Sequence, residues 1–177
     1  MQKIAGRLEE IFLNHHVIHF PMKATFAAGC FWGVEYDFSQ VPGVKSTVVG
    51  YIGGDEKKYP KPSYEEVCTN KAGYAEAVQI EFDPKKVTYE KLLGIFWKIH
   101  DPTTVNRQGP DIGAQYRSAV FYHTEVQKKA ALESLKKQEQ IIGRKIATQI
   151  VPATTFFRAE DYHQKYAEKH GGAVCHI

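Results

Sequence analysis

The amino-acid sequence predicts an α+β fold, a two-layer sandwich in which one sheet carries helices packed against it. Stretches with strand alternation and stretches with helical spacing are interspersed along the chain, and their connections are irregular rather than repeated βαβ units. The 177 residues suit one domain with one sizeable core. Because we find no internal repeat and no linker, we expect a single domain over residues 1–177.

The first part of the chain predicts a helix, a strand, a second helix and a second strand. Residues 1–19 have apolar side chains on one helical face. Residues 22–29 predict a strand, and the helix that follows it ends at Pro42-Gly43. Residues 44–52 are rich in β-branched side chains and predict the second strand, before a loop rich in lysine and proline. The apolar residues that define the two helices are Ile4, Leu8, Ile11, Phe31, Val34, Phe38 and Val41.

The middle of the chain contains the clearest strand. Residues 75–82 ("AEAVQIEF") alternate strictly, so that Glu76 shares a face with three apolar residues. Thr88 can cap the next helix. Residues 100–117 form a long polar loop without periodicity, and loops of this length are often functional. The remaining predicted elements are a strand at 118–123, a helix from "TEVQ" to about residue 141 with Gly143 as its stop, a strand at 145–151 and a helix at 160–170.

Composition and charge exclude several classes of function. The net charge of +3, from 23 basic and 20 acidic residues, is too small and scattered for a nucleic-acid or anionic-membrane surface. No stretch approaches the roughly 20 apolar residues of a membrane helix. The N-terminal residues are interrupted by charges and histidines and lack the apolar core of a signal peptide. The three cysteines are an odd number for a disulfide framework, so we expect a cytoplasmic protein.

Cys30 is the first candidate for chemistry. It lies in "AAGCFWGVE", where the predicted strand ends and the predicted helix begins. Unpaired N–H groups and the positive end of the helix dipole stabilise a thiolate at such a position. Gly29 and Gly33 leave room for a substrate, and the two aromatic residues after the cysteine supply an apolar wall. The alternative is that the aromatics belong to the core and that the thiol is inert.

Glu76 is the second candidate. Its place on the apolar face of its strand directs the carboxylate toward the core, where unpaired burial would raise its pKa and make it a usable general acid. The alternative is that Glu76 lies at the strand end in water or pairs with a lysine.

These residues resemble the A-type peptide methionine sulfoxide reductases from about residue 24 to Cys175. The motif "GCFWGVE" is highly specific to that family. It is followed, in the family's order, by "GYIGG", "PSYEEVC", "AEAV", "FDP", "HDPTTVNRQGPDIGAQYRSA" and "AEDYHQKY". We expect a mixed, mainly antiparallel sheet with a ferredoxin-like core.

The resemblance implies a reaction and a role for each matching residue. Cys30 would attack the sulfur of methionine-S-sulfoxide, Glu76 would supply a proton, and Tyr64 and Tyr116 would bind the sulfoxide oxygen. Hydroxyl donors aimed at a developing oxyanion are a sensible arrangement for this step. The residues implied in substrate binding are Phe31 and Trp32, around the methyl group, and Asp111, which orients the substrate; Asp111 is alternatively a turn residue after Pro110.

The resemblance also implies how the enzyme is recycled. A sulfenic acid left on Cys30 would condense with Cys175, which lies on a tail at residues 171–177, and thioredoxin, or a dithiol such as DTT in vitro, would reduce the disulfide. The alternative is that Cys175 is an incidental terminal thiol. Cys68 is expected to pack near the site. No bound cofactor or metal is implied, and we expect a monomer.

Two features depart from the family pattern. Many members have histidine where this chain has Tyr74, which leaves the tuning of Glu76 open. Residues 1–20 lie outside the resemblance and form an N-terminal extension.

Two other functions are alternatives to this one. A redox sensor or thiol peroxidase would let Cys30 react with peroxide, but that reaction needs no methyl pocket. A metal-binding module would use the histidines of "HHVIH" or the terminal Cys175-His176 pair, although no cysteine pair stands near them. The residues of the first motif are His15, His16 and His19.

Overall fold

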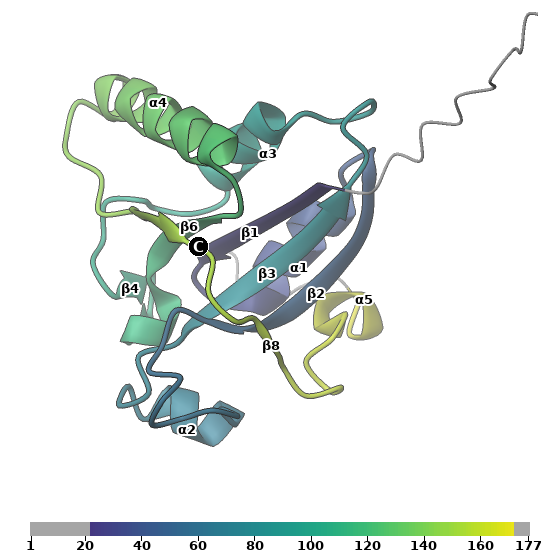
Figure 1. Cartoon of the computed structure of the whole chain (residues 1–177), viewed down its shortest axis with the longest axis vertical. Coiled ribbons are helices and arrows are strands. Elements are labelled where there is room, and N and C mark those ends of the chain that lie inside the picture. Colours follow the sequence, from purple (N-terminus) through teal and green to yellow (C-terminus); the bar gives the residue numbers. More distant parts are fainter. Residues whose placement is uncertain (1–21, 172–177) are drawn as a thin grey trace, which may run out of the picture.

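The computed structural model describes residues 22–171, which form one six-stranded sheet with helices packed on it and a small two-stranded sheet (Figure 1). The strand order in the sheet is β7-β6-β1-β3-β2-β8. Neighbouring strands are antiparallel except β6 and β7, which are parallel, so the expected mixed and mainly antiparallel sheet is confirmed. The predicted helix at 1–19, the histidine motif and Cys175 lie outside the described residues. The strands are β1 (Met22–Ala28), β2 (Val44–Ile52), β3 (Ala75–Phe82), β6 (Ser118–Tyr122), β7 (Gln149–Pro152) and β8 (Phe157–Arg158).

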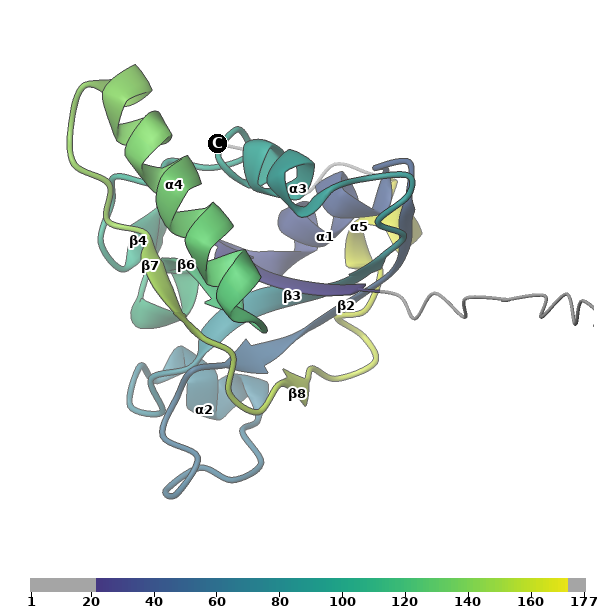
Figure 2. The same cartoon turned by 45° about the horizontal axis from the view of Figure 1, so that its top comes forward.

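Three helices cover one face of this sheet (Figure 2). They are α1 (Phe31–Ser39), α3 (Tyr89–Phe96) and α4 (Glu125–Ile142). Their buried side chains meet those of alternate residues on β1 and β3 in the main core. Phe26 is at its centre, with stacked rings of Phe38 at 5.2 Å and Phe96 at 5.2 Å. Most of the apolar burial that stabilises the fold is on this face.

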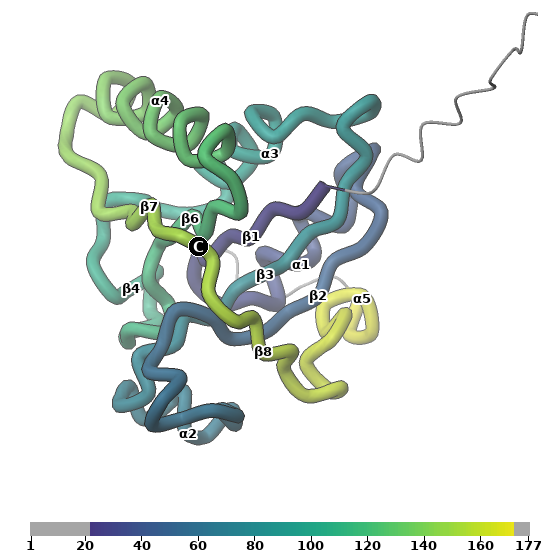
Figure 3. Tube along the Cα trace, viewed as in Figure 1, coloured from purple at the N-terminus to yellow at the C-terminus, as the bar shows by residue number. Residues whose placement is uncertain are grey.

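A short stretch of chain covers the other face. Figure 3 shows the segment between β7 and β8 passing across the sheet. Ala153 and Phe156 of this segment pack on a smaller apolar cluster that includes Ala75 and Ala77. The strict alternation of β3 therefore does not separate a buried face from a solvated one, because both faces of its first half are buried.

Local signals fix the ends of the helices as the sequence predicts. The Thr88 hydroxyl accepts the N–H of Lys91 at the start of α3, and the Thr124 hydroxyl accepts the N–H of Gln127 at the start of α4. Gly143 ends α4 in the left-handed conformation, with a φ of 73°. None of the helices within residues 22–171 is long and apolar enough to cross a membrane.

Two predicted elements differ from the structure, and one helix of the structure is not predicted. The helix predicted at 160–170 is reduced to α5 (Tyr166–Lys169), because the side chains of Glu160 and Gln164 form hydrogen bonds with β2 instead. The strand predicted at 145–151 begins only at Gln149. The loop after β2 contains an unpredicted helix, α2 (Tyr64–Cys68), whose start is a capping box of Ser63 and Glu66.

Candidate active site

Cys30 is the N-cap residue of α1, between β1 and the helix. Gly29 makes this connection with a φ of 93°, which a residue with a side chain rarely adopts. A β-carbon at Gly29 would also lie 2.7 Å from Cγ of Gln108. The side-chain amide of Gln108 accepts the backbone N–H of Asp101 and donates to its carbonyl oxygen, at 3.0 Å each. The long polar loop is thus folded back onto the partly exposed Cys30.

Glu76 lies beside this helix start with its side chain buried, as its position in the alternation predicts. Its Oε2 accepts the backbone N–H of Phe31 at 3.2 Å. Burial raises the pKa of Glu76 to about 8; the hydrogen bond from Phe31 opposes this shift and the charge of Asp111 adds to it. Glu76 is therefore a carboxylic acid near neutral pH, the form that can donate a proton.

Tyr51 faces Glu76 from the neighbouring strand, directly across the β2–β3 pair. Its hydroxyl donates to Oε2 of Glu160 at 2.8 Å, and Oε1 of Glu160 accepts the backbone N–H of Tyr64 at 3.0 Å. Burial, followed by the hydrogen bond to Glu160, raises the pKa of Tyr51 far above its usual range. One carboxylate from the C-terminal segment therefore joins β2 to the first residue of α2.

Tyr64 and Tyr116 share the surroundings of Glu76. Burial raises the pKa of both phenols, and the negative charge of Glu76 raises each further. Tyr64 also hydrogen-bonds the thiol of Cys68, one turn later on α2, and burial raises the pKa of that thiol. The charge of Cys30 contributes to the raised pKa of Tyr116. Both tyrosines remain protonated hydroxyl donors across the physiological pH range.

The polar loop supplies Tyr116 and Asp111. Within it, β4 (Arg107–Gln108) and β5 (Asp111–Ile112) form a small hairpin, and the 3₁₀ turn η1 (Ala114–Tyr116) follows. The buried Arg117 closes the turn by donating to the carbonyl oxygens of Ala114, at 2.9 Å, and Gly53, at 3.2 Å. Asp111 pairs with Gln108 directly after the turn of this hairpin, and its charge raises the pKa values of both Glu76 and Tyr116.

Aromatic rings surround the residues after Cys30. Phe31 is buried, and its ring lies 6.0 Å from that of Tyr51 and 5.1 Å from that of His163. The partly exposed Trp32 stacks on Tyr166 of α5 at 3.8 Å, and its indole N–H donates to Nδ1 of His163 at 3.0 Å. These rings make an apolar wall beside the thiol.

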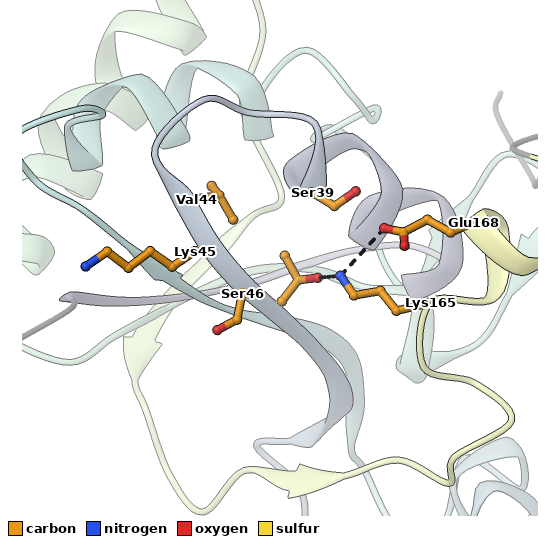
Figure 4. Close-up of a pocket in the computed structure, with 7 residues that line it drawn as sticks. Ser39, Val44, Lys45, Ser46, Lys165 and Glu168 are labelled. Carbon is orange, nitrogen blue, oxygen red and sulfur yellow. Dashed lines mark hydrogen bonds and ion pairs between the residues drawn. The ribbon is translucent and has the colours of Figure 1, made fainter.

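A second polar cluster fastens α5 to α1 and β2. Glu35 is buried on α1, where its Oε1 accepts the hydroxyl of Thr47 at 3.0 Å and its Oε2 accepts the backbone N–H of Lys165 at 2.8 Å. The ammonium of Lys165 lies 3.5 Å from Glu35 and 3.7 Å from Glu168. Figure 4 shows Lys165 and Glu168 on the wall of a small polar cavity of about 140 Å³, which Ser39 and Ser46 also line. This cluster sets where α5, and hence Tyr166, meets Trp32.

Tyr74 is buried, and its hydroxyl donates to the carbonyl oxygen of Tyr59 at 2.8 Å. Its ring meets Phe157 edge-on at 5.6 Å. The residue thus holds the loop after β2 against β8, and its hydroxyl proton is given to Tyr59 rather than to Glu76.

The structure brings seven of the predicted site residues into one region. They are Cys30, Phe31, Trp32, Tyr64, Glu76, Asp111 and Tyr116. The eighth, Cys175, lies outside the described residues. Residue-by-residue reasoning missed Tyr51, Glu160 and His163. Their only signal in the sequence is that they fall within "GYIGG" and "AEDYHQKY", two of the motifs that carry the resemblance.

Comparison with known proteins identifies the family of this chain. A family model described as peptide methionine sulfoxide reductase matches residues 22–177. A relative from Methanosarcina acetivorans named peptide methionine sulfoxide reductase MsrA is 60% identical over 151 residues, which cover 84% of this chain and 79% of the relative.

Solved structures agree with the sequence comparison. The reduced form of Mxr1 from Saccharomyces cerevisiae is 38% identical, with a TM-score of 0.84 over 89% of this chain and 92% of the yeast chain. Mxr1 in complex with Trx2 matches with 27% identity and a TM-score of 0.61, over 89% and 88% of the two chains. The chain belongs to the peptide methionine sulfoxide reductase family.

Proposed function

We propose that this protein reduces methionine-S-sulfoxide, free or in proteins, to methionine, with Cys30 as the nucleophile and Glu76 as the acid. One observation carries the assignment of roles. The N–H of the residue directly after Cys30 donates to the buried Glu76 carboxyl at 3.2 Å, so one peptide unit joins the nucleophile to the acid. The position of Cys30 at the start of α1 favours its thiolate form.

In the first step, the Cys30 thiolate attacks the sulfoxide sulfur while the sulfoxide oxygen takes a proton. Glu76 supplies that proton, and because its Oε2 accepts the Phe31 N–H, we assign the proton to Oε1. The hydroxyls of Tyr64 and Tyr116 donate to the same oxygen and stabilise its developing charge. The oxygen ends on Cys30 as a sulfenic acid. The cysteine sulfur is oxidised by two electrons, and the sulfoxide is reduced to the thioether.

Two sides of the site bind different parts of the substrate and so orient it. Phe31 and Trp32 present apolar surface beside the thiol and bind the S-methyl group. Asp111, on the hairpin opposite, orients the substrate backbone. An apolar wall for the methyl and hydroxyl donors for the oxygen distinguish the two substituents of the sulfoxide, which is the basis for selecting one epimer.

The second step regenerates the thiol. The thiol of Cys175 attacks the sulfenic sulfur of Cys30, water leaves, and a Cys30–Cys175 disulfide forms. A dithiol then reduces this disulfide by exchange. The similarity to Mxr1, which has been crystallised in complex with Trx2, supports thioredoxin as that dithiol. The proposed role is repair of oxidised proteins by a cytoplasmic monomer without a bound cofactor, metal, nucleic acid or membrane. The cysteine usage of the chain and its small net charge support this setting.

Thioredoxin-coupled turnover of the separated epimers tests the proposal. Wild type should turn over the S epimer alone, and Cys30→Ser should abolish this turnover. Cys175→Ser should still release one methionine per enzyme in a single turnover and then stop. If neither epimer reacts while hydrogen peroxide still oxidises Cys30, the peroxide-sensing alternative replaces the proposal.

A further inference from the structure

We propose that Asn70 is a positioning residue that holds the segments of Tyr64 and Tyr116 at a fixed separation, so that both hydroxyls reach one sulfoxide oxygen. The inference rests on the proposed function, because it takes both tyrosines as donors to that oxygen. It gives Asn70 a part in stabilising the transition state, although its own side chain is bonded to the backbone of the polar loop.

The first observation is a hydrogen bond between the two segments that supply the tyrosines. The backbone N–H of Ala114 donates to Oδ1 of Asn70 at 2.6 Å, across 44 residues of sequence. Ala114 is the first residue of η1, and Tyr116 is its last. Asn70 follows the end of α2, whose first residue is Tyr64. The bond therefore joins the turn that carries one phenol to the helix that carries the other.

The second observation is the backbone conformation of Asn70. Its φ of 61° lies in the left-handed region, which asparagine adopts more readily than most residues with a side chain. Its N–H donates to the carbonyl oxygen of Val67 at 3.1 Å, so the chain turns directly after α2. Glycine would suit this turn equally well, since it adopts a positive φ freely. The turn itself does not require the amide of Asn70, and the observed use of its oxygen is the bond to Ala114.

The third observation is that η1 is held from two sides. While the N–H of Ala114 bonds to Asn70, its carbonyl oxygen accepts from the guanidinium of the buried Arg117 at 2.9 Å. The same guanidinium donates to the carbonyl oxygen of Gly53, beyond the end of β2, at 3.2 Å. A short 3₁₀ turn has poor internal hydrogen-bond geometry, so such external contacts decide where it lies. Tyr116 stands between Ala114 and Arg117 and takes its place from both contacts.

The turn also approaches Asn70 closely. At Gly113, directly before η1, a β-carbon would lie 2.9 Å from Oδ1 of Asn70. Gly113 has a φ of 154°, a conformation that a residue with a side chain rarely adopts. The loop therefore has a glycine where it meets the amide of Asn70, and this allows the short contact to Ala114.

The separation of the two phenols matters because they act on one atom. They are near enough that the charge of Tyr116 contributes to the raised pKa of Tyr64, and Glu76 contributes to the raised pKa of each. A hydroxyl donor stabilises an oxyanion well only when the two oxygens are within about 3 Å. Two donors on separate segments meet this condition together only when the segments are held in register, which is the role we assign to Asn70.

Three variants isolate the acceptor. Asn70→Gly removes the amide and keeps the left-handed backbone. Asn70→Asp keeps an oxygen at the position of Oδ1, where it can still accept the N–H of Ala114. Asn106→Gly is the matched control, because Asn106 is exposed, lies in the polar loop and has a φ of 47°. The carbonyl oxygen of Asn106 accepts the N–H of Gly113 at 2.9 Å, and glycine keeps this bond.

The first measurement is the single-turnover rate of methionine release at a pH below the pKa of Glu76, which is about 8. Loss of one oxyanion donor costs about 10²- to 10³-fold, so we expect misplacement in Asn70→Gly to lower the saturating rate about 10-fold, with the half-saturating sulfoxide concentration within about twofold of wild type. Asn70→Asp should recover most of the rate, and Asn106→Gly should match wild type. Equal rates for Asn70→Gly and Asn106→Gly overturn the inference.

A double-mutant cycle separates positioning from a general structural role. In Tyr116→Phe, the hydroxyl that Asn70 positions is absent, so adding Asn70→Gly should lower the rate by less than about twofold more. A structural disturbance would instead lower the rate by the same factor with and without the Tyr116 hydroxyl. That result overturns the inference.

An NMR measurement does not depend on activity. A hydrogen bond moves an amide proton downfield and slows its exchange with water. We expect the amide proton of Ala114 to move upfield and exchange faster in Asn70→Gly, and to stay near its wild-type shift in Asn70→Asp and Asn106→Gly. Absence of sulfoxide reduction in wild type overturns the proposed function. Sulfoxide reduction by wild type with an unchanged Ala114 amide in Asn70→Gly overturns this inference alone.

Discussion

The backbone N–H of Phe31 and the carboxyl of Glu76 are joined by a hydrogen bond of 3.2 Å that spans 45 residues of sequence. Phe31 begins α1, and Glu76 is the second residue of β3, so the bond ties the helix start to the sheet. It also occupies an N–H that the first turn of the helix cannot satisfy internally. The bond favours the carboxylate, but burial outweighs it, and the pKa of Glu76 is raised to about 8.

The first prediction concerns activity against pH. The rate of methionine release in a single turnover should fall as the pH rises through about 8, because Glu76 loses its proton there. Glu76→Gln keeps an oxygen that can accept from Phe31 but has no acidic proton. We expect this variant to lose about 10²- to 10⁴-fold in rate and to lose the alkaline fall as well. Rapid-quench measurements between pH 6 and pH 10 check both, and an unaltered alkaline fall in Glu76→Gln would assign it to another group.

The second prediction concerns stability against pH. The pKa of Glu76 is raised on folding, so the folded state binds its proton more tightly than the unfolded state. This contribution is fully present below pH 4.5, the ordinary value, and is lost as the pH rises to about 8. Relative to Glu76→Gln, wild type should therefore lose a few kcal/mol of unfolding free energy across that range. Urea unfolding at a series of pH values measures it, and parallel curves for the two proteins would contradict a buried, raised pKa.

The sequence predicts the main sheet and the long helices well because their signals are local. Residues 75–82 alternate over a whole strand, and Thr124 and Gly143 mark the ends of α4 by the side-chain and backbone properties of single residues. The positions of Cys30 at a helix start and of Glu76 on the core face follow from the same local signals. The roles of the tyrosines and Asp111 do not, because they depend on a family resemblance.

The parts that local reasoning misses depend on contacts between distant segments. The segment at 159–164 has helical periodicity, yet Glu160 leaves the helical path to accept the N–H of Tyr64, which is 96 residues away in the sequence. The short helix α2 has a capping box, but the residues around it predict a loop. The carboxylate of Glu160 accepts the backbone N–H of its first residue, Tyr64. Such tertiary hydrogen bonds override the weak preference of a short segment.

The third prediction tests the buried Glu35 cluster. Glu35→Ala removes the acceptor for the Thr47 hydroxyl and for the backbone N–H of Lys165, and leaves the Lys165 ammonium with the half-exposed Glu168 and the hydroxyl of Thr47. We expect a loss of about 2–3 kcal/mol of unfolding free energy, because buried donors are left unpaired. Glu168→Ala, which removes the more exposed member of the same cluster, should cost less than about 1 kcal/mol. Urea denaturation of the two variants measures this difference in unfolding free energy. Equal losses would show that burial of the carboxylate does not determine its contribution to stability.

The fourth prediction tests a close approach of β2 and β8. At Gly50, a β-carbon would lie 2.3 Å from the carbonyl oxygen of Phe157 and 2.6 Å from the ring of Phe156. Gly50→Ala must therefore move β8 away from β2, at a cost of about 2–4 kcal/mol. Gly94, within α3, has no atom within 4 Å of such a β-carbon. Gly94→Ala should stabilise the protein by about 0.5–1 kcal/mol, because alanine is the better helix former.

The Gly50 variant also reports on the active site. β8 is followed directly by the segment that carries Glu160 and His163, so a shift of β8 disturbs the hydrogen bonds from Tyr51, Tyr64 and Trp32. We expect Gly50→Ala to lower kcat/KM for methionine sulfoxide about 10-fold or more while Gly94→Ala leaves it unchanged. Thermal unfolding and steady-state kinetics on the same two preparations check this. Full activity in a destabilised Gly50→Ala would mean that the segment with Glu160 and His163 keeps its place without the support of β8.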